Sequence, residues 1–498
     1  MTDGCDAYEV LERRFRRLDI LRQAEGLLHW DQSVLMPPGG ASARGAQLAE
    51  LKVIGHEIIT DPEIELLLGE VDPTALDHWQ QANIREMRRI WADANAVPAD
   101  LVVAHSNACT ACEAVWREAR ANSDFAAVLP TLEEVLRLTR EIGAVKASFL
   151  KVSLYDALLD RYAPGMRIDE ITPVLNDYAD FLPSFLGRVL ERQKMEQPVI
   201  ELPGPFPLDT QRALMRRLAE AVGLDFQSAR LDESLHPFSA GIPEDSRITT
   251  RYDEENFADA MMAVLHETGH AMYERGRPVE WRGQPVGRSR GMVIHESQSL
   301  LVEMQVCRSR DFINWVAPML KEEFSGEGAA WNADNLYRRT TFVEPSFIRV
   351  DADEVTYPAH VILRTRLEQA MLEGDLALKD LPGAWNDAMQ ELLGISPPED
   401  RLGCLQDIHW YDGAWGYFPT YTLGAMAAAQ VFQSARTADS GILPCIAEGD
   451  FKPLMAWLRK NIHGQGCFYT ADELLLRATG RPLDLSSFKT HLQERYLG

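Results

Sequence analysis

Residues 253–278 read DEENFADAMMAVLHETGHAMYERGRP, and this stretch decides how the chain around it is interpreted. Three acidic residues at its start favour a helix N-terminus, while Gly276 and Pro278 mark its end. The apolar residues between them recur at helical spacing. The stretch therefore predicts a helix over 254–275.

This predicted helix carries the pattern HETGH at 266–270. Residues four apart lie one turn apart on the same helix face, so His266 and His270 can reach one metal ion. Glu267 lies beside that face, where its carboxylate can accept a proton from water held by the metal. The pattern predicts a catalytic metal site with Glu267 as the base; the alternative is a helix with two incidental histidines.

A catalytic zinc site needs a third protein ligand and keeps one position open. The candidates downstream are Glu274, Glu280, His295 and Glu296. Glu274 lies on the face of His270, but one helix rarely completes a three-ligand set. Glu296 lies at the start of a second helical pattern, and a ligand on a neighbouring helix is geometrically sensible. Spacing alone favours Glu296, with His295 as the main rival.

Helical periodicity dominates the rest of the chain, and strand signals are few. The β-branched segment 247–252 is the best strand, and Pro/Gly-rich breaks occur at 36–40 and 197–207. We expect a mainly α fold with a small sheet in a single domain spanning 1–498, with a possible lobe boundary near 197–207. Further helices are predicted over 8–28, 42–59, 76–94, 99–121, 124–150, 168–196, 208–222, 289–311, 357–374, 420–436, 447–461 and 471–478.

Composition narrows the classes of partner. The formal charge is -25, and a surface this acidic repels nucleic acid backbones and anionic lipid. No apolar run approaches the roughly 20 residues of a membrane span, and the N-terminus lacks the apolar segment of a secretory signal. We therefore expect neither a nucleic acid nor a membrane partner.

The seven cysteines are odd in number and scattered along the chain, which favours reduced thiols and a cytoplasmic location. Cys109 and Cys112 form a lone CxxC within a helical pattern. No second Cys/His pair accompanies it, so we interpret the two as small helix residues one turn apart rather than a redox or metal site.

Several motifs together resemble one family, the carboxypeptidase Taq or M32 metallocarboxypeptidases. The resemblance extends from about residue 8 to the C-terminus. Its motifs are, in chain order, Trp30-Asp31-Gln32-Ser33-Val34-Leu35-Met36-Pro37, Asp245-Ser246-Arg247-Ile248-Thr249, His266-Glu267-Thr268-Gly269-His270, His295-Glu296-Ser297-Gln298, Ile348-Arg349-Val350-Asp351-Ala352-Asp353 and Gly403-Cys404-Leu405-Gln406-Asp407-Ile408-His409-Trp410.

This resemblance implies a large helical, saddle-shaped metallopeptidase with a deep groove and a three-stranded sheet. It implies a homodimer, a zinc or cobalt (Zn²⁺ or Co²⁺) cofactor and release of single residues from peptides with a free C-terminus, with broad side-chain tolerance. It also implies Glu296 as the third metal ligand, which strengthens the preference from spacing.

The resemblance also implies substrate-binding roles. Arginine suits a free carboxylate because its planar fork bonds both oxygens, and Arg349 is the first candidate from its place in the IRxxAD motif. The alternative for Arg349 is a structural ion pair with Asp351 or Asp353. Arg247 and Asp245 are second candidates, implied to help close the groove end; a loop-stabilising ion pair is their alternative.

Three further roles are weaker predictions. His409 and Tyr421 could steady the developing oxyanion or bond the substrate, and each could equally be a satisfied core residue. His295 is expected to orient a neighbouring side chain rather than bind metal. Segment 247–252 could pair with the substrate backbone as an added edge strand.

Two other functions compete with this interpretation. The nearest is a helical zinc oligopeptidase or dipeptidyl carboxypeptidase with a similar groove. A non-catalytic scaffold with structural zinc is the other, but structural sites usually fill all four positions, often with Cys. No Cys lies near the motif, and Glu267 is retained as a possible base.

Overall fold

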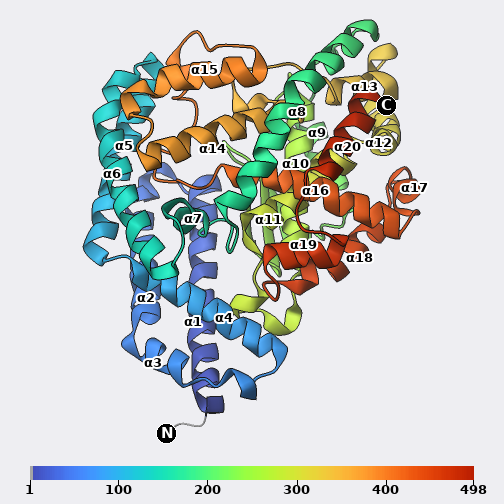
Figure 1. The fold of residues 1–498 in the computed structure, drawn as a ribbon. Helices are drawn as coiled ribbons and strands as arrows, with labels where there is room; N and C mark the ends of the chain where they lie inside the picture. Colours follow the sequence, from blue (N-terminus) through green and yellow to red (C-terminus); the bar gives the residue numbers. More distant parts are fainter. Residues whose placement is uncertain (1–3) are drawn as a thin grey trace.

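The computed structural model describes residues 4–498, which form twenty α-helices and one three-stranded sheet (Figure 1). The fold is therefore mainly α, as predicted. The strands are β1 (Ala229–Glu233), β2 (Ser239–Ile242) and β3 (Asp245–Thr250). The helices are α1 (Gly4–Val34), α2 (Ala41–Thr60), α3 (Pro62–Glu70), α4 (His78–Ala96), α5 (Ala99–Asn122), α6 (Phe125–Leu150), α7 (Leu154–Leu159), α8 (Ile168–Met195), α9 (Leu208–Val222), α10 (Phe257–Gly276), α11 (Gly291–Leu300), α12 (Arg310–Glu323), α13 (Ala333–Thr340), α14 (Tyr357–Glu373), α15 (Leu381–Leu393), α16 (Pro419–Ala438), α17 (Ile442–Ile446), α18 (Lys452–Asn461), α19 (Ala471–Thr479) and α20 (Ser486–Leu497).

Most predicted helices are present close to their expected bounds. The pattern 289–311 is not one helix: α11 ends at Leu300, a π-helical turn follows over Leu301–Val306, and Ser309 caps a new helix by accepting from the backbone N–H of Phe312. The pattern 447–461 is helical only from Lys452. The sequence does not predict α3, α7, α12, α13, α15, α17 and α20. Helices of this length offer few turns for a clear periodic signal.

The sheet has the order β1-β3-β2, with β1 parallel and β2 antiparallel to β3. Because β3 is paired along both sides, it has no free edge for a substrate backbone, and the suggestion that segment 247–252 adds a substrate strand is wrong. The strand also lies two residues earlier, at Asp245–Thr250. Ser246, Ile248 and Thr250 alternate on one buried face of β3, and the strand packs against α10.

Helices α10, α11 and α16 lie together in the middle of the molecule (Figure 1). Glycines allow this close packing. A Cβ built on Gly269 of α10 would lie 2.6 Å from the backbone of Gln298 and Ser299 in α11. A Cβ on Gly424 of α16 would lie 2.9 Å from the Glu296 side chain. The backbones of α10, which carries His266 and His270, and of α11, which carries Glu296, are therefore in close contact.

The predicted break at 197–207 is an extended loop between α8 and α9. The largest hydrophobic cluster includes residues before and after this loop, among them Leu182, Phe185 and Met426. The lobe boundary near 197–207 stays a prediction.

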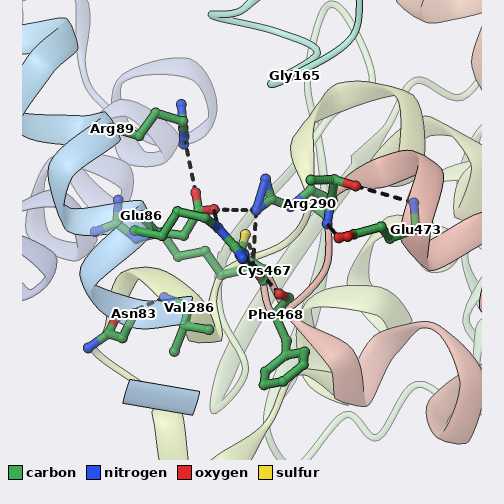
Figure 2. A network of polar contacts seen from close by, with 12 residues as sticks. Asn83, Glu86, Arg89, Gly165, Val286, Arg290, Cys467, Phe468 and Glu473 are labelled. Carbon is green, nitrogen blue, oxygen red and sulfur yellow. Dashed lines mark hydrogen bonds and ion pairs between the residues drawn. The ribbon is translucent and has the colours of Figure 1, made fainter. Parts of the chain in front are cut away.

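A buried polar network ties α4 to the segment that leads into α11. Figure 2 shows Glu86 of α4 between Arg89 and Arg290, with oxygen–nitrogen distances of 3.0 and 2.5 Å. Arg290 also donates to the carbonyl of Cys467 at 3.1 Å. Arg290 and Glu86 are both almost fully buried, and Arg290 directly precedes α11. This ion pair therefore fixes the start of the helix that carries His295 and Glu296.

The placement of the Cys109 and Cys112 thiols agrees with the sequence expectation. Cys109 and Cys112 lie buried on α5 without a disulfide, and burial raises the pKa of both thiols, to about 12 and about 11. They are therefore packed helix residues, as predicted. No helix within residues 4–498 is both long and apolar enough to cross a membrane.

Candidate metal centre

Three side chains from two helices converge at the centre of the molecule. His266 and His270 come from α10, and Glu296 comes from α11. Their ligand atoms all lie within 4.8 Å of one another. The Nε2 atoms of His266 and His270 lie 3.9 and 3.5 Å from the Glu296 carboxylate oxygens. The structure thus brings together the three residues that the sequence predicts as a ligand set.

His266 is oriented by a carboxylate on its far side. Its Nδ1 lies 2.9 Å from Glu303, which is in the π-helical turn, and Arg308 donates to the other Glu303 oxygen at 2.7 Å. An Nδ1–H bonded to Glu303 leaves the Nε2 lone pair of His266 facing the cluster. Burial disfavours a charged imidazole, but Glu303 and Glu296 outweigh it and raise the pKa of His266 to about 10, so this position attracts positive charge.

His270 is oriented through a second histidine. Its Nδ1 lies 2.7 Å from Nδ1 of His295, whose Nε2 lies 3.0 Å from Glu274. If His295 donates to Glu274 through Nε2–H, its Nδ1 accepts from His270, and Nε2 of His270 is then free for a metal. Burial lowers the pKa of His270 to about 4, which favours the neutral, ligating form. Two of the three rivals for the third position, His295 and Glu274, are thereby engaged with each other.

This donor set fits a divalent zinc-like ion. Bonds of about 2.0–2.2 Å in a tetrahedral site put ligand atoms roughly 3–4 Å apart, as are the two histidine–glutamate distances. Two imidazoles and one carboxylate suit zinc and leave a fourth position open, as in catalytic sites. Among the described residues, no other group of three such side chains comes close enough to hold a metal ion.

Glu267 lies buried beside this cluster. Its Oε2 has no hydrogen-bond partner within residues 4–498, and its side chain also contacts Ser239 of β2. Burial raises the pKa of Glu267 to about 7, against the opposing charge of His266. A carboxylate with a pKa near neutrality can both accept and return a proton.

Arg349 is paired with neither of the aspartates considered from the sequence. Its Nε and Nη2 donate to Oδ1 of Asp407 at 3.1 and 2.7 Å, and its Nη1 donates to Tyr357 at 2.8 Å. The expected alternative, a pair with Asp351 or Asp353, is wrong, because Asp353 is occupied by backbone N–H groups and the Thr356 hydroxyl.

Asp407 is shared with a second arginine. Its Oδ2 accepts from Arg364 Nε at 2.7 Å. Two guanidinium groups against one carboxylate leave one excess positive charge in a buried site. Burial lowers the pKa of the nearby imidazoles, to about 4 for His409 and about 3 for His360, so neither adds charge at neutral pH.

His409 and Tyr421 lie beside this charged group. Nε2 of His409 is 3.3 Å from the Tyr421 hydroxyl, and the Arg349 guanidinium lies 4.9 Å from the Tyr421 ring centre. Tyr421 belongs to α16, the helix whose Gly424 packs on Glu296. The predicted residues Arg349, His409 and Tyr421 therefore form one group next to the metal centre.

Asp245 and Arg247 form a separate pair on β3. Nε and Nη2 of Arg247 donate to the Asp245 carboxylate at 3.0 and 2.8 Å. The neighbours of this pair are the other strands and α1, rather than the elements that carry the Arg349 group.

A cavity of about 190 Å³ lies against the centre, with His266, Glu296, Tyr357, Leu300 and Met304 in its wall. A second cavity of about 660 Å³ adjoins it and shares three lining residues with it, Arg308, Val350 and Ala352. His266 and Glu296 thus face a cavity that has a larger cavity beside it.

Several residues of this site have no role in the sequence interpretation. Glu303 lies seven residues after Glu296, a helical spacing that could have indicated a shared face. Asp407 is part of a recognised motif but has no partner assigned from the sequence. Arg364 and Tyr357 give no sequence signal, because only the fold places them beside Arg349.

Fold and site together define the class: a helical metallopeptidase of the HExxH type with a glutamate as third candidate ligand. The family model of carboxypeptidase Taq (M32) metallopeptidases matches residues 10–496. This chain belongs to that family and is a metallocarboxypeptidase.

Individual relatives agree. The chain is 38% identical to thermostable carboxypeptidase 1 of Thermus thermophilus over 502 residues, covering 98% of each chain. It is 29% identical to carboxypeptidase 1 of Bacillus subtilis, covering 97% of this chain and 96% of that one. Metallocarboxypeptidase 1 of Trypanosoma cruzi has a similar structure, with a TM-score of 0.97, 40% identity and 99% of each chain covered.

Proposed function

We propose that this enzyme is a zinc-dependent carboxypeptidase that releases single residues from peptide C-termini and tolerates many side chains. One observation carries the proposal: Tyr357 lines the same cavity as His266 and Glu296 and accepts a hydrogen bond from Arg349 at 2.8 Å. Tyr357 therefore connects the cavity at the metal-type centre to an arginine with spare charge.

The chain's own residues account for the proton transfers. When bound, zinc supplies Lewis acidity, which polarises a carbonyl oxygen and lowers the pKa of water to about 7. Glu267 accepts a proton from the attacking water and returns it to the leaving amine. Proton transfer of this kind contributes about 10²–10⁴-fold to the rate. Tyr421, held by His409, donates a hydrogen bond to the carbonyl oxygen as negative charge develops there.

The Arg349 group recognises the terminal carboxylate. Asp407 and Tyr357 use three of the five N–H groups of Arg349, which leaves one on each Nη atom. Two N–H groups of one guanidinium can bond both oxygens of a carboxylate. The excess positive charge left by Arg364 and Arg349 against Asp407 compensates the charge that the substrate brings into a buried site.

The shape of the cavity supports release of one residue. Its volume of about 190 Å³ is below the roughly 300–1,000 Å³ of pockets that enclose drug-sized ligands. Its apolar wall includes Leu300, Met304 and Pro358. The charged groups beside it are already paired, so the wall favours no particular charge and fits a broad side-chain tolerance.

The test is timed mass spectrometry of one mixed-sequence peptide, with a free or an amidated C-terminus, with and without added zinc. Single residues lost in order from the free C-terminus support the proposal. Dipeptides or internal fragments would instead identify a dipeptidyl carboxypeptidase or oligopeptidase. The control is Glu267→Gln, which should bind zinc as the wild type does and lose nearly all hydrolysis.

A chelator separates catalytic from structural zinc. Loss of hydrolysis with the fold retained supports the enzyme, and global unfolding would favour a scaffold role. Cobalt should restore activity to the chelated enzyme, since the same donor set accepts it. The absence of nucleic acid and membrane partners, the homodimer and the cytoplasmic location stay predictions; size-exclusion chromatography with light scattering tests the dimer.

A further inference from the structure

Trp30, near the C-terminal end of α1, contacts two arginines of the sheet. The guanidinium carbons of Arg247 and Arg230 lie 4.3 and 4.6 Å from its ring centre. Trp30 is only 2% exposed, and its Nε1 has no hydrogen-bond partner among residues 4–498. The indole therefore presents its ring, rather than its polar edge, to the two cations.

The register of the sheet explains why the two arginines need the contact with the Trp30 ring. Parallel pairing of β1 and β3 places Arg230 directly beside Arg247, and like charges at neighbouring positions repel. Each arginine is bonded to an aspartate of its own strand: Asp232 for Arg230, at 2.6 Å, and Asp245 for Arg247, at 2.8 Å. These bonds reduce the repulsion, and the electron-rich ring face over both cations adds a further attraction.

Arg247 needs this support if it is to bind a peptide. A free arginine side chain has many rotamers, and holding it in one costs conformational entropy. Asp245 fixes Nε and Nη2, which leaves Nη1 to reach an acceptor outside the pair. The Asp245 side chain is itself 46% exposed, so solvent competes for this bond, and the ring of Trp30 adds a second contact to the guanidinium.

Asp31, the neighbour of Trp30, ties this end of α1 to the rest of the N-terminal region. Asp31 pairs with Arg44 of α2 at 2.6 Å, and Arg44 also donates to the Leu28 carbonyl at 2.7 Å. The end of α1 is thus tied to α2, and Trp30 is held in place over the sheet. This gives a physical role to the motif at 30–37, which the metal centre does not use.

We propose that Trp30 is a positioning residue for Arg247, so that α1 contributes to peptide binding without touching the peptide. The proposal rests on the proposed function and on the predicted role of Arg247 in binding peptide at the groove end. It adds that the orientation of Arg247 depends on the aromatic ring of Trp30.

The test is a double-mutant cycle of Trp30→Leu and Arg247→Ala, measured by steady-state kinetics on one peptide and by unfolding of the metal-loaded protein. Trp30→Leu should raise KM about 2- to 30-fold, the range expected from losing a cation–π contact, with kcat within about twofold. The double variant should have a KM no higher than Arg247→Ala alone. Trp30→Phe, which keeps an aromatic face, should recover part of the loss.

Trp315→Leu is the matched control. Trp315 of α12 packs on Phe312 and Phe451, away from the sheet. Its loss should lower stability and leave KM unchanged. If Trp30→Leu behaves in the same way, or if the KM effects of Trp30→Leu and Arg247→Ala multiply, Trp30 is only a packing residue and the proposal fails.

The positioning role of Trp30 and the carboxypeptidase function can be overturned separately. If the wild type releases single residues but Arg247→Ala leaves KM unchanged, the positioning proposal is overturned and the carboxypeptidase function stands. If the wild type releases no residues, the proposed function fails. The double-mutant cycle measured by unfolding then tests whether Trp30 stabilises Arg247. Non-additive losses of stability then support the contact of Trp30 with Arg247, and additive losses overturn it.

Discussion

Glu303 lies 2.9 Å from Nδ1 of His266, and its other oxygen is bonded to Arg308 at 2.7 Å. The carboxylate thus fixes which imidazole nitrogen faces Glu296 and His270. Partners of this kind fix the ring orientation of a metal-binding histidine and raise its basicity.

Glu303→Gln should therefore weaken zinc binding by about 10- to 100-fold, as measured by competition with a chromogenic chelator. Glutamine keeps the size of the side chain but loses the charge that polarises His266, and it leaves Arg308 without its carboxylate. Glu267→Gln is the control and should keep wild-type zinc affinity. Equal zinc affinity in Glu303→Gln and wild type would contradict the role.

Arg349→Ala should cost about 100-fold or more in kcat/KM on peptides with a free C-terminus, because it removes two hydrogen bonds to a charged group. On C-terminally amidated peptides the further loss should be much smaller. Arg349→Lys is the control, since it keeps the charge without the planar fork. Its kcat/KM on peptides with a free C-terminus should lie between those of the wild type and Arg349→Ala. Equal losses on both substrates would assign Arg349 to structure alone.

We expect the buried Asp407 carboxylate to make the protein less stable in acid. Burial raises its pKa, but Arg364 and Arg349 outweigh this and hold the pKa well below its ordinary value of 3.8. A depressed pKa contributes stability that is present above about 3.8 and is lost as the pH falls below it.

Asp407→Asn removes that titration. The variant should be less stable than wild type at pH 7, by about 3–5 kcal/mol for a broken buried pair, and the gap should narrow as the pH falls below about 4. Denaturant unfolding across this range, from neutral to acidic buffer and with a chelator present for both proteins, measures the gap without metal release. A gap that stays constant with pH would contradict the assignment.

The ligand set could be predicted from the sequence because it depends on local geometry. The spacing of His266 and His270 is fixed by the helical repeat, and spacing favours Glu296 on the next helix, a preference that the resemblance strengthens. The small sheet and most long helices could likewise be recognised, since long periodic segments carry strong signals.

The partners of these residues could not be predicted, because they depend on long-range packing. Asp407 lies 58 positions from Arg349 in the chain and Arg364 lies 43 from Asp407, and nothing local selects these pairs over Asp351 or Asp353. The π-helical turn that carries Glu303 is absorbed into one predicted helix, because its apolar residues keep a near-helical period.

A substitution at Gly269, inside the HETGH pattern, tests how closely α10 and α11 pack. A Cβ at this position would lie 2.6 Å from backbone atoms of Gln298 and Ser299, which cannot rotate away as a side chain can. Gly269→Ala should therefore push α11 from α10 and lower the free energy of unfolding by about 1–3 kcal/mol, the usual cost of overpacking. Because α11 carries Glu296, zinc affinity should fall as well.

The matched control is Gly187→Ala on the exposed face of α8, where a Cβ meets nothing within 4 Å. There alanine should raise the free energy of unfolding by about 0.5–1 kcal/mol, because it restricts the unfolded chain and favours the helix. Thermal and denaturant unfolding of the metal-free proteins compares the two substitutions directly. Opposite signs support close helix contact as the reason for glycine at position 269, whereas a stabilised Gly269→Ala with unchanged zinc affinity would show that α10 and α11 have room between them.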